Sequence, residues 1–170
     1  DLLSTWLGYP QTNGPEVLRE KIAFLYPDAE IDNILVTNGS AEANFISIWS
    51  AIDPGDELVF MTPNYMQISG LAKAFGANVK PFHLREDLNG APDFEELKSQ
   101  MTPRTKMIAV CNPNNPTGAV LGEDSIQKIV GLAEKVGAWI LSDEVYRGAE
   151  LTSDSKTPTF RGRYEKVLGI

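Results

Sequence analysis

Four short polar segments of the sequence hold the residue types that bind small ligands. Each follows a run of apolar residues and contains Gly, Pro, Asn or Asp, which is typical of a loop at the end of a strand. They are residues 38–41 (Asn-Gly-Ser-Ala), 63–65 (Pro-Asn-Tyr), 112–118 (Asn-Pro-Asn-Asn-Pro-Thr-Gly) and 143–146 (Asp-Glu-Val-Tyr). Together they offer hydroxyl and amide donors, aromatic rings and a carboxylate, so a planar ligand that carries an anionic group is one chemistry they could serve.

Ser40 and Ala41 stand where a helix is expected to begin. The free N–H groups and the positive dipole end of a helix start attract an anion, and Ser40 adds a hydroxyl donor. Ser40 could instead serve only as the cap of that helix. The segment is not a P-loop, because no Gly-Lys-Ser/Thr follows it. It therefore indicates either a phosphate site or a plain cap.

The other three segments also allow two interpretations each. The ring of Tyr65 could stack on a planar ligand or simply pack against its neighbours. Two Asn-Pro steps fix a rigid turn in residues 112–118, which could present amide donors or be only a turn. Asp143 ends an apolar strand, and a partly desolvated carboxylate needs a cation or strong donors. A protonated ring nitrogen would supply that cation, and a salt bridge or a helix cap is the alternative.

The composition excludes several classes of function. The 170 residues, with 42% hydrophobic and 22% charged residues, are typical of one soluble globular domain. A net charge of −8 argues against a nucleic-acid partner. No apolar run reaches the roughly 18–20 residues that span a bilayer, and no signal peptide is recognisable at the start. Cys111 and His83 are the single residues of their types, so we expect no disulfide, no metal site and a cytoplasmic location.

Short β-branched runs alternate with helical stretches along the chain. The expected strands are residues 34–37, 57–61, 79–84, 106–111, 139–142 and 166–170. The expected helices are residues 16–25, 41–52, 65–75, 93–100 and 123–136, with Gly76 expected directly after the third helix. This alternation predicts an α/β fold with a mainly parallel sheet and helices on both faces. Ligands of such sheets bind beyond the carboxyl ends of the strands, where all four polar segments would lie.

In combination, the four segments resemble the fold type I enzymes that use pyridoxal 5′-phosphate (PLP). The chain is most similar to the class I/II aminotransferases, the aspartate aminotransferase superfamily, from Tyr9 to Ile170. The resemblance implies a PLP-binding large domain over residues 34–170, preceded by a helical segment over residues 1–33. It also implies transfer of an amino group between an amino acid and a 2-oxo acid by a cytoplasmic homodimer.

The resemblance implies a cofactor role for each matching residue. These roles are Ser40 and Ala41 at the phosphate, Tyr65 stacked on the ring, Asn115 and Tyr146 at the ring 3-oxygen, and Asp143 at the pyridine nitrogen. Charge pairing with the Asp143 carboxylate would keep that nitrogen protonated and strengthen the electron sink of the ring. Tyr9 lies in a stretch similar to the family's Tyr…Gly…Leu-Arg segment. It would reach the cofactor phosphate of the other protomer, or merely pack at an interface or surface.

The chain departs from the family pattern in its lysines. The family's Schiff-base lysine follows the strand that residues 166–170 match, and none of the nine lysines present stands in such a setting. We therefore expect a truncated large domain, with the catalytic lysine beyond Ile170, the C-terminal small domain absent and the chain inactive alone. Two alternatives remain open, a fragment of a PLP-dependent lyase, decarboxylase or synthase of the same fold, and a non-catalytic truncated module.

Overall fold

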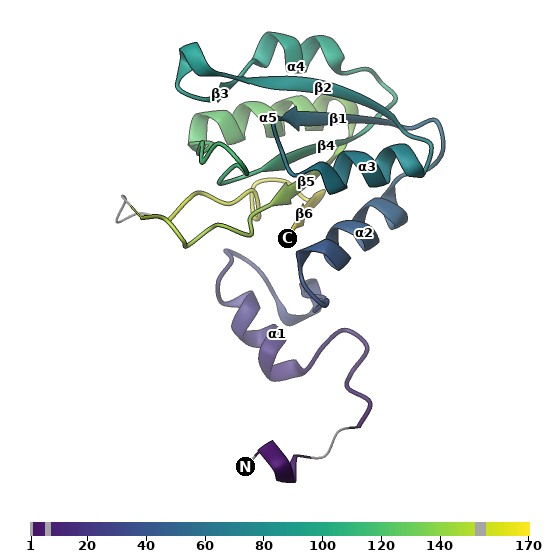
Figure 1. The fold of residues 1–170 in the computed structure, drawn as a ribbon, viewed down its shortest axis with the longest axis vertical. Coiled ribbons are helices and arrows are strands. Elements are labelled where there is room, and N and C mark those ends of the chain that lie inside the picture. The colour runs from purple at the N-terminus through teal and green to yellow at the C-terminus, as the bar shows by residue number, and fades with distance from the viewer. Residues whose placement is uncertain (1, 6–7, 152–155) are drawn as a thin grey trace.

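A six-stranded sheet in the order β3-β2-β1-β4-β5-β6 forms the centre of the molecule in the computed structural model, which describes residues 2–5, 8–151 and 156–170 (Figure 1). β3 pairs antiparallel with β2, and all other neighbouring strands pair in parallel. The predicted α/β fold with a mainly parallel sheet is thus confirmed. The strands are β1 (Glu57–Thr62), β2 (Asn78–Arg85), β3 (Ala91–Pro92), β4 (Thr105–Cys111), β5 (Trp139–Asp143) and β6 (Val167–Gly169).

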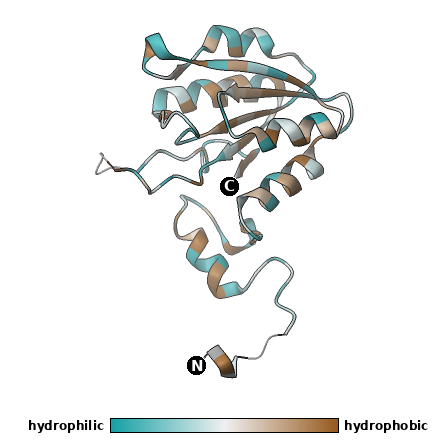
Figure 2. Cartoon of the chain, in the orientation of Figure 1, coloured by the Kyte–Doolittle hydropathy of each residue, from teal (hydrophilic) through white to brown (hydrophobic). Residues whose placement is uncertain are grey.

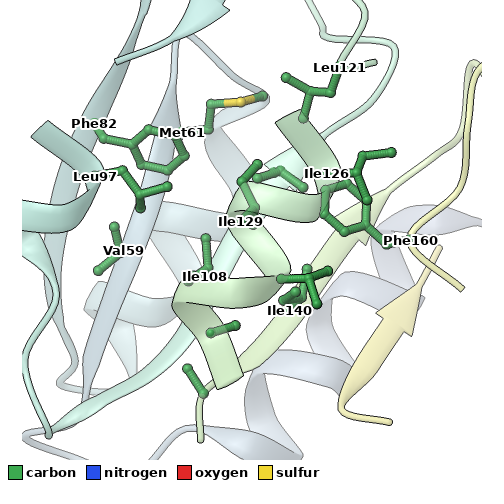
Figure 3. Packing of buried hydrophobic residues seen from close by; sticks show 14 of the residues in the cluster. Val59, Met61, Phe82, Leu97, Ile108, Leu121, Ile126, Ile129, Ile140 and Phe160 are labelled. Atoms are coloured by element: carbon green, nitrogen blue, oxygen red, sulfur yellow. The ribbon is translucent and has the colours of Figure 1, made fainter. Parts of the chain in front are cut away.

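Helices cover both faces of the sheet, as predicted. The helices are α1 (Glu16–Ala23), α2 (Ser40–Ala51), α3 (Met66–Ala74), α4 (Phe94–Gln100) and α5 (Glu123–Val136), with short 3-10 turns η1 (Leu2–Ser4), η2 (Ile31–Asn33) and η3 (Glu86–Leu88). α2 and α3 cover one face of the sheet, and α4 and α5 cover the other. Because the side chains of a strand alternate between the two faces, β1 sends Val59 to the side of α4 and α5 and Leu58 to the side of α2 and α3. Figure 3 shows the first of these two cores, and Figure 2 shows the hydrophobic strands between the helices.

Local signals set the ends of several helices. The Asp93 side chain caps α4 by accepting a hydrogen bond of 2.9 Å from the Glu96 N–H. The helix α5 has the predicted bounds, and Gly137 follows it in the left-handed conformation. Gly76 follows α3 with a φ of 83°, so its predicted position after this helix is also confirmed. The other predicted bounds differ from the observed ones by one or two residues.

The predicted strand at residues 34–37 is not formed. Within the described residues no strand pairs with them, and the Val36 N–H instead donates a hydrogen bond of 3.0 Å to the Asn13 carbonyl. A cavity of about 680 Å³ lies between this segment and β6, lined among others by Val36, Leu168 and Ile170. A β-branched run forms a strand only where a partner strand pairs with it, and here none does.

The N-terminal part of the chain projects away from the sheet (Figure 1), and the hydrogen bond between Val36 and Asn13 connects it to residues 34–37. Buried Arg19 of α1 donates hydrogen bonds to the carbonyls of Gly14 (3.1 Å) and Ile31 (3.0 Å). Gly14 has a φ of 100°, and a Cβ atom there would lie 2.5 Å from the side chain of Val36. Only glycine therefore fits this contact. Among the described residues, no helix is long and apolar enough to cross a membrane.

Candidate functional site

Hydrogen bonds hold the four polar segments together at the carboxyl edge of the sheet, one of them through Gln67, which lies two residues beyond segment 63–65. Three bonds do so: Gln67 Nε2 to the Ala41 carbonyl (3.0 Å), Asn114 Nδ2 to the Pro63 carbonyl (3.0 Å), and the Asn112 N–H to the Asp143 carbonyl (2.8 Å). The start of α2 is thereby joined to α3, the turn after β1 to the loop after β4, and that loop to the end of β5. The expected convergence of the segments is thus observed.

The start of α2 leaves backbone donors free. Gly39 is the N-cap residue, with a φ of 89° and a ψ of 169°, and Ser40 is the first residue of the helix. The interpretation of Ser40 as the cap is therefore wrong. The conformation of Gly39 is one that essentially only glycine adopts. Among the described residues, no acceptor takes the N–H groups of Ser40, Ala41 or Glu42. These groups and the helix dipole can receive an anion.

The three asparagines of the loop after β4 have different surroundings. Buried Asn112 exchanges hydrogen bonds with the backbone of Leu121, accepting at 2.8 Å and donating at 3.3 Å. Asn114 is buried as well and holds the Pro63 carbonyl. Half-buried Asn115 makes no side-chain hydrogen bond within the described part of the chain. Asn112 and Asn114 thus fix the loop, and the side-chain amide of Asn115 stays unengaged by the described chain. The repeated Asn-Pro steps indicated a rigid loop but not this division.

Asp143 is a buried carboxylate without a cation. Its side chain accepts a hydrogen bond of 3.2 Å from the Val145 N–H, and the residue is 3% exposed. Burial raises the pKa of Asp143, while the Val145 N–H and the Asn44 side chain lower it. No Lys, Arg or His of the described residues lies within 4.0 Å of it. Within the described residues Asp143 forms no salt bridge, and no helix begins after it that it could cap, so both of these alternative interpretations are wrong.

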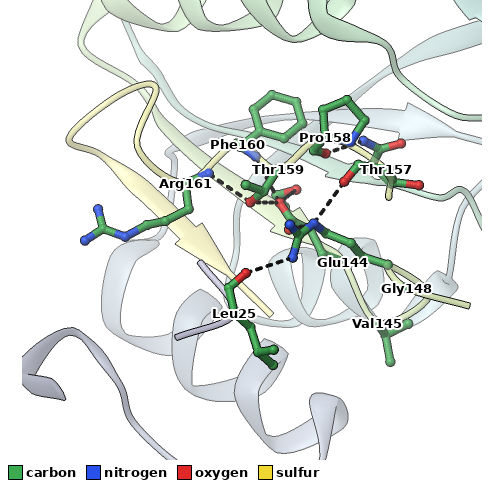
Figure 4. Close-up of polar contacts among 12 residues, drawn as sticks. Leu25, Glu144, Val145, Gly148, Thr157, Pro158, Thr159, Phe160 and Arg161 are labelled. Atoms are coloured by element: carbon green, nitrogen blue, oxygen red, sulfur yellow. Dashed lines mark hydrogen bonds and ion pairs between the residues drawn. The ribbon is translucent and has the colours of Figure 1, made fainter. Parts of the chain in front are cut away.

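Glu144 is a second buried carboxylate, and it organises the neighbouring chain rather than the site (Figure 4). Its Oε1 accepts hydrogen bonds from the Ser142 hydroxyl (3.1 Å), the Thr159 hydroxyl (2.9 Å) and the Phe160 N–H (3.0 Å). Burial raises the pKa of Glu144. Sequence reasoning missed this role, because a glutamate at the end of a strand gives no sign of such distant donors.

The tyrosines differ in their placement. Tyr65 lies at the N-cap of α3 and Tyr146 three residues beyond Asp143, so both stand at the carboxyl edge with rings about half exposed. Tyr9 is fully exposed, and the structure does not bring it to the other candidate residues. The arrangement as a whole offers free N–H groups, amide and phenol groups and one buried carboxylate. Such a set can hold a phosphorylated aromatic ring with a cationic nitrogen.

Known proteins are similar to this chain in sequence and in fold. Residues 2–167 match the family "aminotransferase class I and II". The chain is 34% identical over 146 residues to an aspartate aminotransferase of Pyrococcus horikoshii, covering 83% of this chain and 37% of that protein. It is also 34% identical over 129 residues to a capreomycidine synthase of Streptomyces vinaceus, covering 74% of this chain and 33% of that protein.

A solved structure gives the same result. The crystal structure of a PLP-dependent aminotransferase from Streptococcus suis matches with a TM-score of 0.92 and 36% identity, covering 99% of this chain and 44% of that one. The chain thus spans less than half the length of each of these three proteins.

Proposed function

Because the chain belongs to the class I and II aminotransferases, a PLP-dependent family, we propose that its carboxyl-edge site binds PLP for transfer of an amino group between an amino acid and a 2-oxo acid. The observation that carries this proposal is the buried Asp143, which lacks a cation within the described residues. A buried carboxylate of this kind is costly unless a positive group completes the site. A protonated pyridine nitrogen is such a group.

The other residues of the site fit the rest of the cofactor. The free N–H groups at Ser40 and Ala41 would receive the phosphate, as helix starts commonly do. Tyr65 would lie against the ring, and the free amide of Asn115 would donate to the ring 3-oxygen together with the Tyr146 hydroxyl. Each role uses a group that no other part of the described chain engages.

When bound, PLP supplies an electron sink for the substrate carbon that loses a proton. The chain's own part is to orient the ring and fix its charge. The Asp143 carboxylate would hold a proton on the ring nitrogen by charge pairing, and its burial strengthens this pairing by excluding water. The start of α2 and Asn115 would set the ring's position against that carboxylate.

We also propose that the 170 residues do not transaminate by themselves. Lys166 donates a hydrogen bond of 3.0 Å to the Gly137 carbonyl, just before β5, and Lys80 pairs with Glu57 at the start of β1. Both lysines therefore lie at the amino edge of the sheet, opposite the candidate site. If PLP followed by borohydride modified one lysine stoichiometrically, with loss of that adduct in the Asp143→Ala variant, this second proposal would be wrong.

A lyase or synthase reaction is the second candidate. It is favoured by the 34% identity to a capreomycidine synthase, which equals the identity to an aspartate aminotransferase. The same cofactor site would serve either reaction.

We further propose a cytoplasmic homodimer in which the exposed Tyr9 contacts the partner or its cofactor. Measuring the mass of the protein by light scattering, with a Tyr9→Ala variant alongside, tests the dimer.

The experiment for the cofactor site uses pyridoxamine 5′-phosphate, which carries the ring and the phosphate but no aldehyde for a lysine. We expect saturable binding by titration calorimetry. Asp143→Asn should weaken the affinity at least about tenfold, since a charge-assisted hydrogen bond contributes roughly 1.5–3 kcal/mol. The matched control is Asp124→Asn in the first turn of α5, which should bind like the wild type. No binding by the folded wild-type protein, or equal affinity of the two variants, would reject the site.

A further inference from the structure

Asn44 of α2 is a completely buried polar residue that the proposed function leaves without a role. Neither its amide nitrogen nor its amide oxygen has a hydrogen-bond partner of normal geometry within the described chain. Buried amides are almost always paired, because an unpaired one loses its hydration without compensation. The side chain of Asn44 therefore calls for an explanation beyond packing.

The periods of the helix and the strand place Asn44 beside Asp143. Ile48 of α2 and Leu141 of β5 belong to the same buried cluster. Asn44 precedes Ile48 by one helical turn, and Asp143 follows Leu141 by two residues on the same face of the sheet. Both steps lead toward the carboxyl edge, where α2 begins. In agreement with this placement, the Asn44 side chain lowers the pKa of Asp143.

We propose that Asn44 is a positioning residue, whose amide holds the Asp143 carboxylate in place to face the ring nitrogen of PLP. The identity of that ring rests on the proposed function. The Val145 N–H holds the carboxylate as well, at 3.2 Å, so both of these donors are neutral. A neutral donor orients the carboxylate without cancelling its charge, whereas an Arg or Lys in the place of Asn44 would pair with it. The full negative charge of Asp143 is thereby kept for the cofactor.

The amide suits both protonation states of Asp143. Its nitrogen donates to a carboxylate, and its oxygen accepts from a carboxylic acid. The titratable group beside Asp143 on the neighbouring strand is Cys111, which pairs in register with it. Burial raises the pKa of the Cys111 thiol to about 11, so this neighbour stays neutral. On the other side, β6 ends in Gly169 and brings no charge. The amide of Asn44 is thus the polar side chain that α2 supplies to this carboxylate.

The test measures the pKa of Asp143 in the cofactor-free protein, by carbon-13 NMR of its carboxyl group, which the Asp143→Asn variant assigns. Asn44→Leu keeps the branched shape of the side chain and removes the donor, and we expect it to raise the pKa of Asp143. Asn44→Ala also removes the donor but introduces no larger side chain, so it tests the same effect on the pKa if the leucine variant does not fold. Asn44→Ser returns a short donor and should recover part of the shift. Ile48→Leu changes the same helix face without a polar group and should leave the pKa unchanged.

A second measurement separates this proposal from the cofactor assignment. Asn44→Leu should bind pyridoxamine 5′-phosphate about tenfold more weakly than the wild type, and Asn44→Ser should recover part of the affinity. If Asp143 titrates at the wild-type pH in both donor-free variants, the role of Asn44 is wrong, whatever the binding. If the pKa shifts as expected but the wild type does not bind pyridoxamine 5′-phosphate, the contact between Asn44 and Asp143 stands and the proposed function fails.

Discussion

The side-chain amide of Asn114 donates a hydrogen bond of 3.0 Å to the main-chain carbonyl of Pro63, and thereby ties the loop after β4 to the turn after β1. The next residue, Asn115, has no such bond within the described chain. Of these two adjacent asparagines, one stabilises the loop and the other leaves its amide free for the proposed ligand.

Substitution of these two asparagines should give opposite results. Asn114→Ala should lower the free energy of unfolding by about 1–3 kcal/mol, because the hydrogen bond from its side chain to the Pro63 carbonyl is lost. Asn115→Ala should change it by less than about 0.5 kcal/mol but weaken binding of pyridoxamine 5′-phosphate about tenfold. Urea denaturation and titration calorimetry measure the two quantities. Equal losses of stability in the two variants would contradict the division.

Asp143→Asn should stabilise the cofactor-free protein while it weakens the binding of cofactor. Burial raises the pKa of Asp143, so the folded state holds its proton more tightly than the unfolded state. The stabilisation by protonated Asp143 is fully present below its pKa in the unfolded chain, about 3.9. It is lost as the pH rises through the pKa of Asp143 in the folded chain. Asparagine keeps the shape and removes the buried charge.

Thermal melting of the wild-type and Asp143→Asn proteins at several pH values checks this sign. The melting temperature of the variant should exceed that of the wild type by about 2–4 °C at pH 7. A gain of roughly 1 kcal/mol in the free energy of unfolding produces a shift of this size in a domain of this length. The difference should shrink toward pH 4. A variant that is less stable than the wild type at pH 7 would show that Asp143 is already paired with a positive group.

Glu57 should make the fold sensitive to acid. Its buried carboxylate oxygens lie 2.7 Å from the Lys80 Nζ, 2.6 Å from the Thr102 hydroxyl and 2.9 Å from the Arg104 Nη2, and they accept a hydrogen bond from each of these groups. The bond from Lys80, followed by that from Thr102, lowers the pKa of Glu57 to about 2. The lowered pKa means that the charged Glu57 stabilises the fold. This stabilisation is fully present above the pKa of a glutamate in the unfolded chain, about 4.3, and is lost as the pH falls through about 2.

The variant Glu57→Gln isolates this contribution from those of the exposed carboxylates. Its free energy of unfolding should be about 1–3 kcal/mol lower than that of the wild type at pH 7, and the two free energies should become equal toward pH 2. Urea denaturation at pH 2 to 7 measures the difference. A constant difference over this range would mean that the charge of Glu57 is not responsible.

Glu144 should control the anchoring of residues 156–161. Glu144→Ala removes the single oxygen that accepts three hydrogen bonds. It should lower the free energy of unfolding by about 3 kcal/mol, at roughly 1 kcal/mol per bond. Glu144→Gln keeps an acceptor oxygen and should lose much less. Limited trypsin digestion should cut the alanine variant faster after Arg161. Equal cleavage of both variants and the wild type would refute this anchoring role.

The elements that the sequence predicts best are those with local end signals. The helix at residues 123–136 lies between glycines, of which Gly137 is left-handed, so its bounds depend on neighbours in the sequence. The run at residues 34–37 has equally strong strand composition but no partner strand in the part of the chain that the structure describes. Pairing is decided by distant parts of the chain, and no local pattern contains it.

The candidate site shows the same limit. Three of its four segments are predictable because polar residues after apolar strands gather at one edge of a parallel sheet, whereas residues 38–41 follow a run that forms no strand within the described chain. The supporting contacts of Asn112 and Glu144 are not predictable, since their partners are fixed only by the folded chain. Asn44 did leave a signal, because it shares a helix face with Ile48 and Ile52, both buried. A polar residue on an otherwise apolar helix face indicates that its side chain has a specific buried role.

The bonds that close the carboxyl edge have a consequence for how this region tolerates change. Gln67 and Asn114 supply the side-chain donors, and the acceptors are main-chain oxygens of Ala41 and Pro63. Any amino acid carries a carbonyl, so replacements on the accepting side can retain the link, whereas replacements of either donor break it. Sequence variation at this rim should therefore be one-sided, permitted at the residues that are held and restricted at those that hold them.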